Sequence, residues 1–246
     1  MIRLLCLAIL AFPQAAPAPQ GEVLVSAAAS LTEVFQELGS LWNLRSGEKI
    51  VLNVGASNML ARQIAAGARV DLFVSADEQQ MDLVAGHILA SSRVDLLSNQ
   101  LAIAVPDDKP RRLLSVRDLA DASIRRIALG DPAAVPAGVY AKAYLQKLGI
   151  WDAIAAKVVP SSSVRLALAA VETGAADAAI VYRTDIVTAS RAREAFVVPA
   201  ADGPRIVYPA AVLHEGHNTG GAKRFLEFLR SDEATKVFAR AGFSRP

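Results

Sequence analysis

The sequence has 246 residues, and its 26 basic side chains nearly balance its 24 acidic ones. The Lys and Arg residues are scattered and form no basic stripe, which argues against a dedicated nucleic-acid-binding protein. A single cysteine excludes a disulfide framework and any site built from several thiolates. The length suits one large domain or two modest ones.

The N-terminal residues have the pattern of an export signal. Arg3 is followed by a short apolar run over residues 4–12 and by the small residues Ala16-Pro17-Ala18. This is the order found in secretory signal peptides, and the run is about half of the ~20 residues that a membrane-spanning helix needs. We therefore expect a signal peptide over residues 1–18, with an uncleaved anchor as the alternative. Its removal would take away Cys6, the only cysteine.

Short β-type runs alternate with amphipathic helical stretches through the first part of the chain. The pattern predicts strands at 23–25, 50–54, 71–74 and 101–105, and helices at 31–42, 59–66 and 77–84. An alternation of this kind favours parallel sheets that are covered by helices.

The alternation restarts after the charged, proline-flanked segment 106–110, which we interpret as a crossover between lobes. The pattern there predicts strands at 127–129, 158–159, 179–182, 196–198 and 206–213, and helices at 138–147, 164–171 and 225–238. We predict an α/β protein of two lobes joined by a double crossover, with residues 22–104 and 208–246 in the first lobe and 105–207 in the second. Ligands favour the cleft between two such lobes.

Sequence patterns of catalytic sites are missing. The chain has no G-x-S-x-G, no Walker A loop and no G-x-G-x-x-G, so we propose no catalytic residue. His214-Glu215-Gly216-His217 resembles half of a metal-binding motif. However, Gly216 and the Asn-Thr-Gly-Gly run after it predict a loop in place of the helix that H-E-x-x-H requires. We expect loop histidines here, and no site for a bare metal ion.

Hydroxyl side chains follow two predicted strands of the first lobe. Ser30 comes at the start of a helix and forms an S-x-x-E capping pattern with Glu33, and Ser57 starts the next helix. Because helix N-termini carry unpaired N–H groups and a partial positive charge, such turns can hold an oxyanion. The alternative is that both serines merely cap their helices.

Three positions of the second lobe could complete a neutral cage. Ala137 opens a helix beside Gly138, where little side-chain bulk shields the backbone amides. The N–H of Val164 starts another helix. Tyr182 ends an apolar strand, where a phenol hydroxyl can be the polar tip of a buried ring. For Tyr182 the alternative is core packing with its hydroxyl satisfied elsewhere.

The segments taken together resemble the periplasmic molybdate-binding proteins of ABC transporters. The matching stretches span nearly all of the chain after residue 20 and occur in order, at 27–32, 60–68, 71–77, 130–132, 135–142, 179–182 and 214–218. The resemblance implies a type II periplasmic binding protein fold, with two Rossmann-like lobes joined by a double crossover hinge.

The resemblance also implies how the ligand is held. In that family two serines, backbone amides and a tyrosine hydroxyl bind a tetrahedral oxyanion, and the corresponding residues here are Ser30, Ser57, Ala137, Val164 and Tyr182. The implied ligand is molybdate, with tungstate binding similarly, and molybdenum enters only as that oxyanion. No cofactor is implied. The expected protein is a periplasmic monomer, not embedded in the membrane after signal cleavage, that delivers its ligand to a membrane permease.

Three residues add to or depart from the family pattern. Asn58 and a methionine follow Ser57 where the family usually has further Ser or Gly, and Asn58 either adds a donor or caps the helix. Arg69 replaces a small residue or proline, and we expect it at the surface. Arg165 follows Val164 at a helix start and could point to solvent.

Three alternatives remain open at this stage. The ligand could be another tetrahedral oxyanion such as sulfate or phosphate. An enzyme on the same two-lobe fold is a second alternative, although the chain shows no base–nucleophile set. A cytoplasmic ligand-sensing domain of a regulator is the third, and both the predicted export signal and the lack of room for a DNA-binding helix-turn-helix argue against it.

Overall fold

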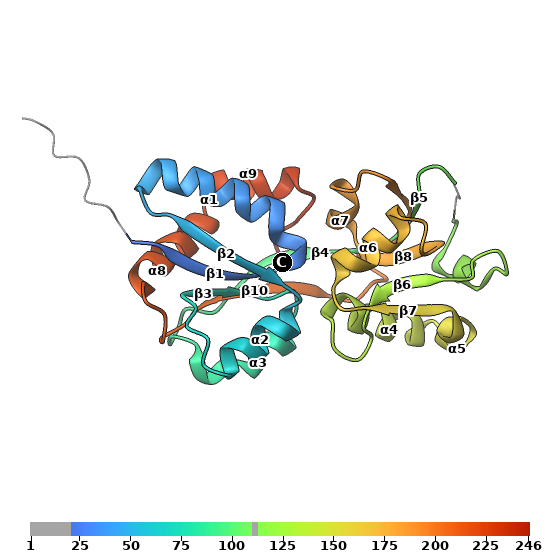
Figure 1. Cartoon of the computed structure of the whole chain (residues 1–246), viewed down its shortest axis with the longest axis horizontal. Coiled ribbons are helices and arrows are strands. Elements are labelled where there is room, and N and C mark those ends of the chain that lie inside the picture. Colours follow the sequence, from blue (N-terminus) through green and yellow to red (C-terminus); the bar gives the residue numbers. More distant parts are fainter. Residues whose placement is uncertain (1–20, 110–112) are drawn as a thin grey trace, which may run out of the picture.

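The computed structural model describes residues 21–109 and 113–246. The predicted signal peptide, including Cys6, and part of the predicted crossover segment 106–110 lie outside the described residues. Figure 1 shows two α/β lobes side by side, each built on its own twisted sheet. The predicted two-lobe α/β fold is therefore confirmed.

The sheet of the first lobe combines strands from both ends of the chain. Its order is β2-β1-β3-β10-β4, formed by β1 (Val23–Ala28), β2 (Ile50–Gly55), β3 (Leu72–Val74), β4 (Val94–Asn99) and β10 (Ile206–Val212). Strands β1, β2 and β3 are parallel, so that Val25 lies opposite both Leu52 and Leu72. Strand β10 runs antiparallel to β3 and β4.

The sheet of the second lobe repeats this plan. Its order is β7-β6-β8-β5-β9, formed by β5 (Leu101–Pro106), β6 (Ile127–Gly130), β7 (Val158–Ser161), β8 (Ala178–Tyr182) and β9 (Ala192–Val197). Strands β6, β7 and β8 are parallel, whereas β5 runs antiparallel to β8 and β9. Each sheet is thus mixed, whereas the sequence predicted parallel sheets. The strand with which the chain enters each sheet from the other lobe, β10 in the first and β5 in the second, runs antiparallel to its neighbours.

Helices cover both faces of each sheet (Figure 1). The first lobe contains the 3-10 turn η1 (Ala29–Leu31), α1 (Thr32–Ser46), α2 (Ser57–Ala65), α3 (Glu78–Leu83), η2 (Ala85–His87), α8 (Thr219–Leu229) and α9 (Asp232–Arg240). The second lobe contains η3 (Val116–Ala120), α4 (Pro136–Lys147), α5 (Trp151–Ile154), η4 (Ala155–Lys157), α6 (Val164–Glu172) and α7 (Arg183–Val187). Within the described residues no helix combines the length and apolar character needed to cross a membrane.

The chain crosses between the lobes at two points. One crossing lies between Asn99 at the end of β4 and Leu101 at the start of β5. The other lies between Val197 at the end of β9 and Ile206 at the start of β10. Residues 101–104 therefore belong to the second sheet, which corrects the predicted boundary at 104/105. The chain crosses before β5 and not at the predicted segment 106–110. Likewise, Ile206 already pairs with Asn99 in the first sheet, before the predicted boundary at 207/208. A fully apolar strand suits either sheet, so its composition could not show which sheet it joins.

One strand of this core was missed by the sequence analysis, and another contains a proline. Strand β4 was not predicted, although Leu96 and Leu97 are fully buried. Strand β10 is a single buried strand although Pro209 interrupts it, and a register shift between Tyr208 and Pro209 accommodates the proline. Proline lacks an N–H, so a strand tolerates it at a bulge of this kind.

Candidate functional site

Ser30 lies in the 3-10 turn η1 that joins β1 to α1, and its side chain is buried. Its Oγ is 3.0 Å from the phenol oxygen of Tyr208. The predicted capping box with Glu33 does not form, because Leu31 is the N-cap of α1 and no side chain caps this helix. The turn η1 comes before the helix and directs the hydroxyl of Ser30 inward, so the capping interpretation of Ser30 is wrong.

Ser57 is the first residue of α2, and Ala56 is the N-cap. Its buried Oγ accepts a hydrogen bond of 2.9 Å from the N–H of Ala76, so it does not cap α2 either. Asn58 does not cap the helix, and its buried Oδ1 atom has no hydrogen-bond partner within the described part of the chain. The β2–α2 turn therefore places two buried polar side chains next to each other.

Ala137 lies in the first turn of α4, directly after Pro136, and is buried. Gly138 holds this turn against the end of β6, because a Cβ atom at Gly138 would lie 1.8 Å from the carbonyl oxygen of Gly130. No side chain could be accommodated at that distance. The close approach brings the first-turn amides of α4, which lack intrahelical partners, to the carboxyl edge of the second sheet.

Val164 is the first residue of α6 and is buried. The side chain of Ser163 caps this helix by accepting a hydrogen bond of 3.2 Å from the N–H of Leu166. The cap satisfies one first-turn amide, and the N–H of Val164 has no partner within the helix. Helix α6 also contacts η1, so Val164 and Ser30 lie on facing elements of the two lobes.

Tyr182 is the last residue of β8, and only 1% of its surface is exposed. Its hydroxyl is buried and has no hydrogen-bond partner among the residues that the structure describes. Burial raises the pKa of Tyr182 well above 10, so the hydroxyl keeps its proton and can donate. A buried donor without an acceptor is costly, and an anion beside it would supply that acceptor.

The five predicted site residues come from five different loops, and contacts link the loops in a chain. The rings of Tyr182 and Tyr208 are 5.7 Å apart, which joins Tyr182 to Ser30 through the hydroxyl of Tyr208. The N–H of Ala76 binds Ser57, and Asp77 is the next residue. Burial and the negative charge of Asp77 both raise the pKa of the phenols of Tyr182 and Tyr140. Tyr140 lies in α4, the helix that carries Ala137.

A network behind the phenols was missed by the sequence analysis. The Asn99 side-chain amide donates to the hydroxyl of Thr184, at 2.9 Å, and to that of Tyr208, at 3.2 Å. Tyr208 is fully buried, and the Ile-Val-Tyr run at 206–208 repeats the Ile-Val-Tyr run at 180–182 that contains Tyr182. That likeness was the only feature of the sequence that pointed to Tyr208. Because Asn99 and Tyr208 are 109 residues apart, their contact is visible only in the fold.

Arg165 carries the cationic group next to this set, and the structure corrects its predicted position. Its side chain is 22% exposed, and its Nε lies 3.0 Å from Oδ1 of the fully buried Asp185. Burial raises the pKa of Asp185 to about 7, although the nearby guanidinium lowers it. Arg165 also pairs with Glu33. Its charge is therefore balanced by carboxylates and does not project freely into solvent.

Asp77 is a second buried carboxylate near the phenols. Its Oδ1 caps α3 by accepting a hydrogen bond of 2.8 Å from the N–H of Gln80. Burial raises its pKa, and the hydrogen bonds from Gln80 and Ser75 act in the opposite direction. Besides burial, the Asp77 charge raises the pKa of both Tyr140 and Tyr182, whereas the Arg205 guanidinium lowers that of Tyr140.

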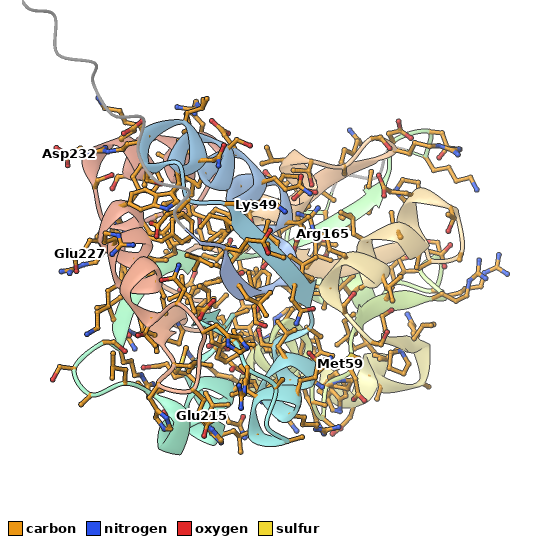
Figure 2. The ribbon with its side chains drawn as sticks, turned by 60° about the vertical axis from the view of Figure 1, so that its left-hand side comes forward. Lys49, Met59, Arg165, Glu215, Glu227 and Asp232 are labelled. Carbon is orange, nitrogen blue, oxygen red and sulfur yellow. The ribbon has the colours of Figure 1, made fainter. Side chains whose placement is uncertain are left out.

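The predicted loop histidines lie apart from this set. His214 contacts the carbonyl oxygen of Gly86, at 3.0 Å, and His87 contacts Glu215, at 3.1 Å. Figure 2 shows Glu215 at the end of the first lobe, far from Arg165. Residues 21–109 and 113–246 hold no group of three His, Cys, Asp or Glu side chains arranged for a metal ion. Arg69 is exposed, as expected.

Comparison with known proteins identifies the class to which this arrangement belongs. Residues 23–244 match the family described as bacterial extracellular solute-binding proteins. The molybdate-binding protein ModA of Escherichia coli is 37% identical to the chain over 233 residues, which covers 92% of this chain and 90% of that protein. The chain belongs to the ModA family of extracellular solute-binding proteins. Members of the ModA family are binding proteins, which confirms the prediction that the chain is not an enzyme.

Solved structures share the two-lobe fold. The periplasmic molybdate-binding protein of Azotobacter vinelandii superposes with a TM-score of 0.82 at 25% identity, covering 91% of this chain and 99% of that one. The sulfate-binding protein SubI of Mycobacterium tuberculosis superposes with a TM-score of 0.80 at 18% identity, covering 92% of this chain and 87% of that one. At 18% identity the likeness to SubI shows the fold alone. The sulfate-binding protein thus shares the two-lobe fold of this chain.

Proposed function

We propose that this ModA-family protein captures molybdate between its lobes and passes it to the permease of an ABC transporter. The proposed ligand-binding groups are the hydroxyls of Ser30, Ser57 and Tyr182 and the backbone N–H groups of Ala137 and Val164. The observation that carries the proposal is the Tyr182 hydroxyl, a protonated donor that is buried without an acceptor among the described residues. An oxyanion satisfies such a donor.

Neutral donors suit a dianion that must be released again. The amides of Ala137 and Val164 lie in the first turns of α4 and α6, where the helix dipole favours negative charge. Each charge-assisted hydrogen bond contributes roughly 1.5–3 kcal/mol. The guanidinium of Arg165, the residue after Val164, is already paired with Glu33 and Asp185. Hydrogen bonds, and not a salt bridge, therefore supply the affinity.

Ion size separates the candidate oxyanions. Sulfate is smaller than molybdate, so its oxygen atoms would leave some of the rigidly held amides unpaired, and each buried unpaired donor costs about 1–3 kcal/mol. The close packing at Gly138 keeps the α4 amides from following a smaller ion. Tungstate has nearly the same size and geometry as molybdate. We therefore propose that tungstate binds similarly and sulfate weakly.

The cellular setting follows from the family and from the N-terminal sequence. Extracellular solute-binding proteins act outside the cytoplasm, and we propose that residues 1–18 direct this chain to the periplasm. We propose a monomer that needs no cofactor, holds molybdenum only as the oxyanion and has the transporter permease as its protein partner. The two lobes would enclose the ion and present a joint surface to that permease.

A thermal-shift panel on the exported, processed protein tests the ligand assignment. Molybdate, tungstate, sulfate and phosphate are compared at equal concentration, followed by titration calorimetry of the anions that shift Tm. Ligands that bind only the native state raise Tm in proportion to the logarithm of concentration over Kd. We expect molybdate and tungstate to raise Tm, with little effect from sulfate or phosphate. An equal shift with sulfate would overturn the assignment and make the protein a general oxyanion binder.

A further inference from the structure

Arg165 connects the two lobes directly. It lies in the first turn of α6 in the second lobe, and its Nη2 donates to Oε2 of Glu33, at 2.5 Å. Glu33 belongs to the first turn of α1 in the first lobe, and these two residues are 132 positions apart in the sequence. Figure 2 shows Arg165 where the second lobe meets the first. The ion pair therefore exists only when the lobes are together.

The guanidinium is held in place from its own lobe. Its Nε lies 3.0 Å from Oδ1 of the buried Asp185, and its Nη1 donates to the hydroxyl of Thr188. The other carboxylate oxygen of Asp185 accepts a hydrogen bond of 3.1 Å from the N–H of Tyr182. Because α7 already orders the Arg165 side chain, pairing with Glu33 restricts only the glutamate.

Both ends of the ion pair are adjacent to proposed ligand-binding residues. Glu33 is three residues after Ser30, and Arg165 directly follows Val164. We propose that the Glu33–Arg165 pair is a latch between the lobes that slows the release of the bound oxyanion. The inference rests on the proposed function, because release is defined only for a ligand held between the lobes. The latch contacts no ligand and acts by holding Ser30 near Val164.

The size of the effect follows from exposure. The side chain of Glu33 is 50% exposed, and exposed ion pairs change an equilibrium by only about two- to fivefold. Loss of the pair should therefore speed release by about threefold. Salt screens exposed charges, so the difference in release rate between the wild type and a variant without the pair should shrink at about 1 M salt.

Glu33 is the position to change, because replacing Arg165 would leave Asp185 buried without its partner. The experiment measures molybdate dissociation by stopped-flow tryptophan fluorescence, with excess tungstate as the chase, for Glu33→Gln and Glu33→Lys. Glu37 provides the matched control, since it lies one turn further along α1, is also 50% exposed and pairs with Arg240 within the first lobe. Glu37→Gln and Glu37→Lys therefore remove a similar ion pair that does not join the lobes.

We expect Glu33→Gln to release molybdate about threefold faster than the wild type and Glu33→Lys faster still, with both Glu37 variants unchanged. Wild-type release rates in both Glu33 variants would overturn the latch and leave the molybdate assignment intact. If the wild type binds none of the four oxyanions, the proposed function fails, and small-angle scattering then decides the latch. Repulsion from Arg165 should give Glu33→Lys a larger radius of gyration than Glu37→Lys. Equal radii of gyration would reject the latch.

Discussion

The Oγ atom of Ser30 lies 3.0 Å from the phenol oxygen of Tyr208, across 178 residues of sequence. The same phenol accepts a hydrogen bond from Asn99. Ser30 is therefore held in position by a strand that the chain forms only on its return to the first lobe. This contact fixes the direction of a proposed ligand-binding hydroxyl before any ligand enters.

Tyr208→Phe should lower both stability and affinity, because it leaves Ser30 and the Asn99 amide buried without their common partner. The expected loss is about 1–3 kcal/mol of unfolding free energy and a few-fold weaker molybdate binding. Urea denaturation and calorimetry measure the two effects. A double-mutant cycle with Ser30→Ala in the absence of ligand should be non-additive, and additive losses of stability would show that the contact contributes nothing.

Tyr182→Phe should separate stability from binding. Without ligand, the substitution removes a buried hydroxyl that lacks a partner, so the free energy of unfolding should be unchanged or higher. With ligand, one donor is lost, and molybdate affinity should fall roughly tenfold, or about 1–2 kcal/mol. Tyr144→Phe, in α4 but outside the proposed set, is the control and should bind normally. Wild-type affinity in Tyr182→Phe would assign this ring to the core.

Gly138→Ala should destroy the α4 part of the site. The new Cβ would lie 1.8 Å from the carbonyl oxygen of Gly130 and 2.8 Å from that of Asp131, so the backbone must move. Overpacking of this severity costs on the order of 3 kcal/mol or more, and molybdate affinity should fall with it because the Ala137 amide shifts. Gly86→Ala, where a Cβ meets nothing within 4 Å, is the matched control for denaturation and calorimetry. Equal effects of the two substitutions would contradict the packing argument.

Asp185→Asn should alter the pH dependence of stability. Burial raises the pKa of Asp185 from 3.8 to about 7 in the folded protein. The native state therefore binds more protons than the unfolded chain between these values, and this group lowers the unfolding free energy as pH rises from about 4 to 7. Asparagine does not titrate, so the stability of the variant relative to the wild type should rise over that range, by up to about 4 kcal/mol.

Asp177→Asn provides the opposite sign for comparison, measured by denaturation at pH values that extend below about 4. Burial acts to raise the pKa of Asp177, but hydrogen bonds from the N–H groups of Arg125 and Arg126 outweigh it and lower the pKa. This carboxylate therefore stabilises the native state as pH rises through its lowered pKa toward 3.8, and above that pH the variant should be less stable than the wild type by a constant amount. If the stability of Asp185→Asn relative to the wild type is equally constant between about pH 4 and 7, the burial of charge at Asp185 is contradicted.

Local patterns in the sequence were sufficient to locate most helices and strands and the two-lobe class. Apolar spacing in a segment such as 164–171 reports directly on the face that a helix buries, and the turns after strands indicated Ser30, Ser57 and Val164 as polar or amide positions. The predicted lobe boundary at 104/105 cut through strand β5 (Leu101–Pro106), because an apolar strand carries no information about its partners. The capping interpretation of Ser30 failed because its hydroxyl contacts a distant residue and not its own helix.

The sequence alone determined the family, the alternation of strands and helices and the five residues proposed to bind the oxyanion. Only the tertiary structure decided what surrounds them. Tyr208 reaches Ser30, Asn99 reaches Thr184, and Arg165 joins Glu33 to Asp185. These contacts span tens to hundreds of residues. Ser30–Tyr208 and Arg165–Asp185 form within one lobe, whereas Asn99–Thr184 and Arg165–Glu33 depend on how the two lobes are placed against each other. Local propensity encodes the elements, whereas burial of the surfaces between them selects which side chains meet.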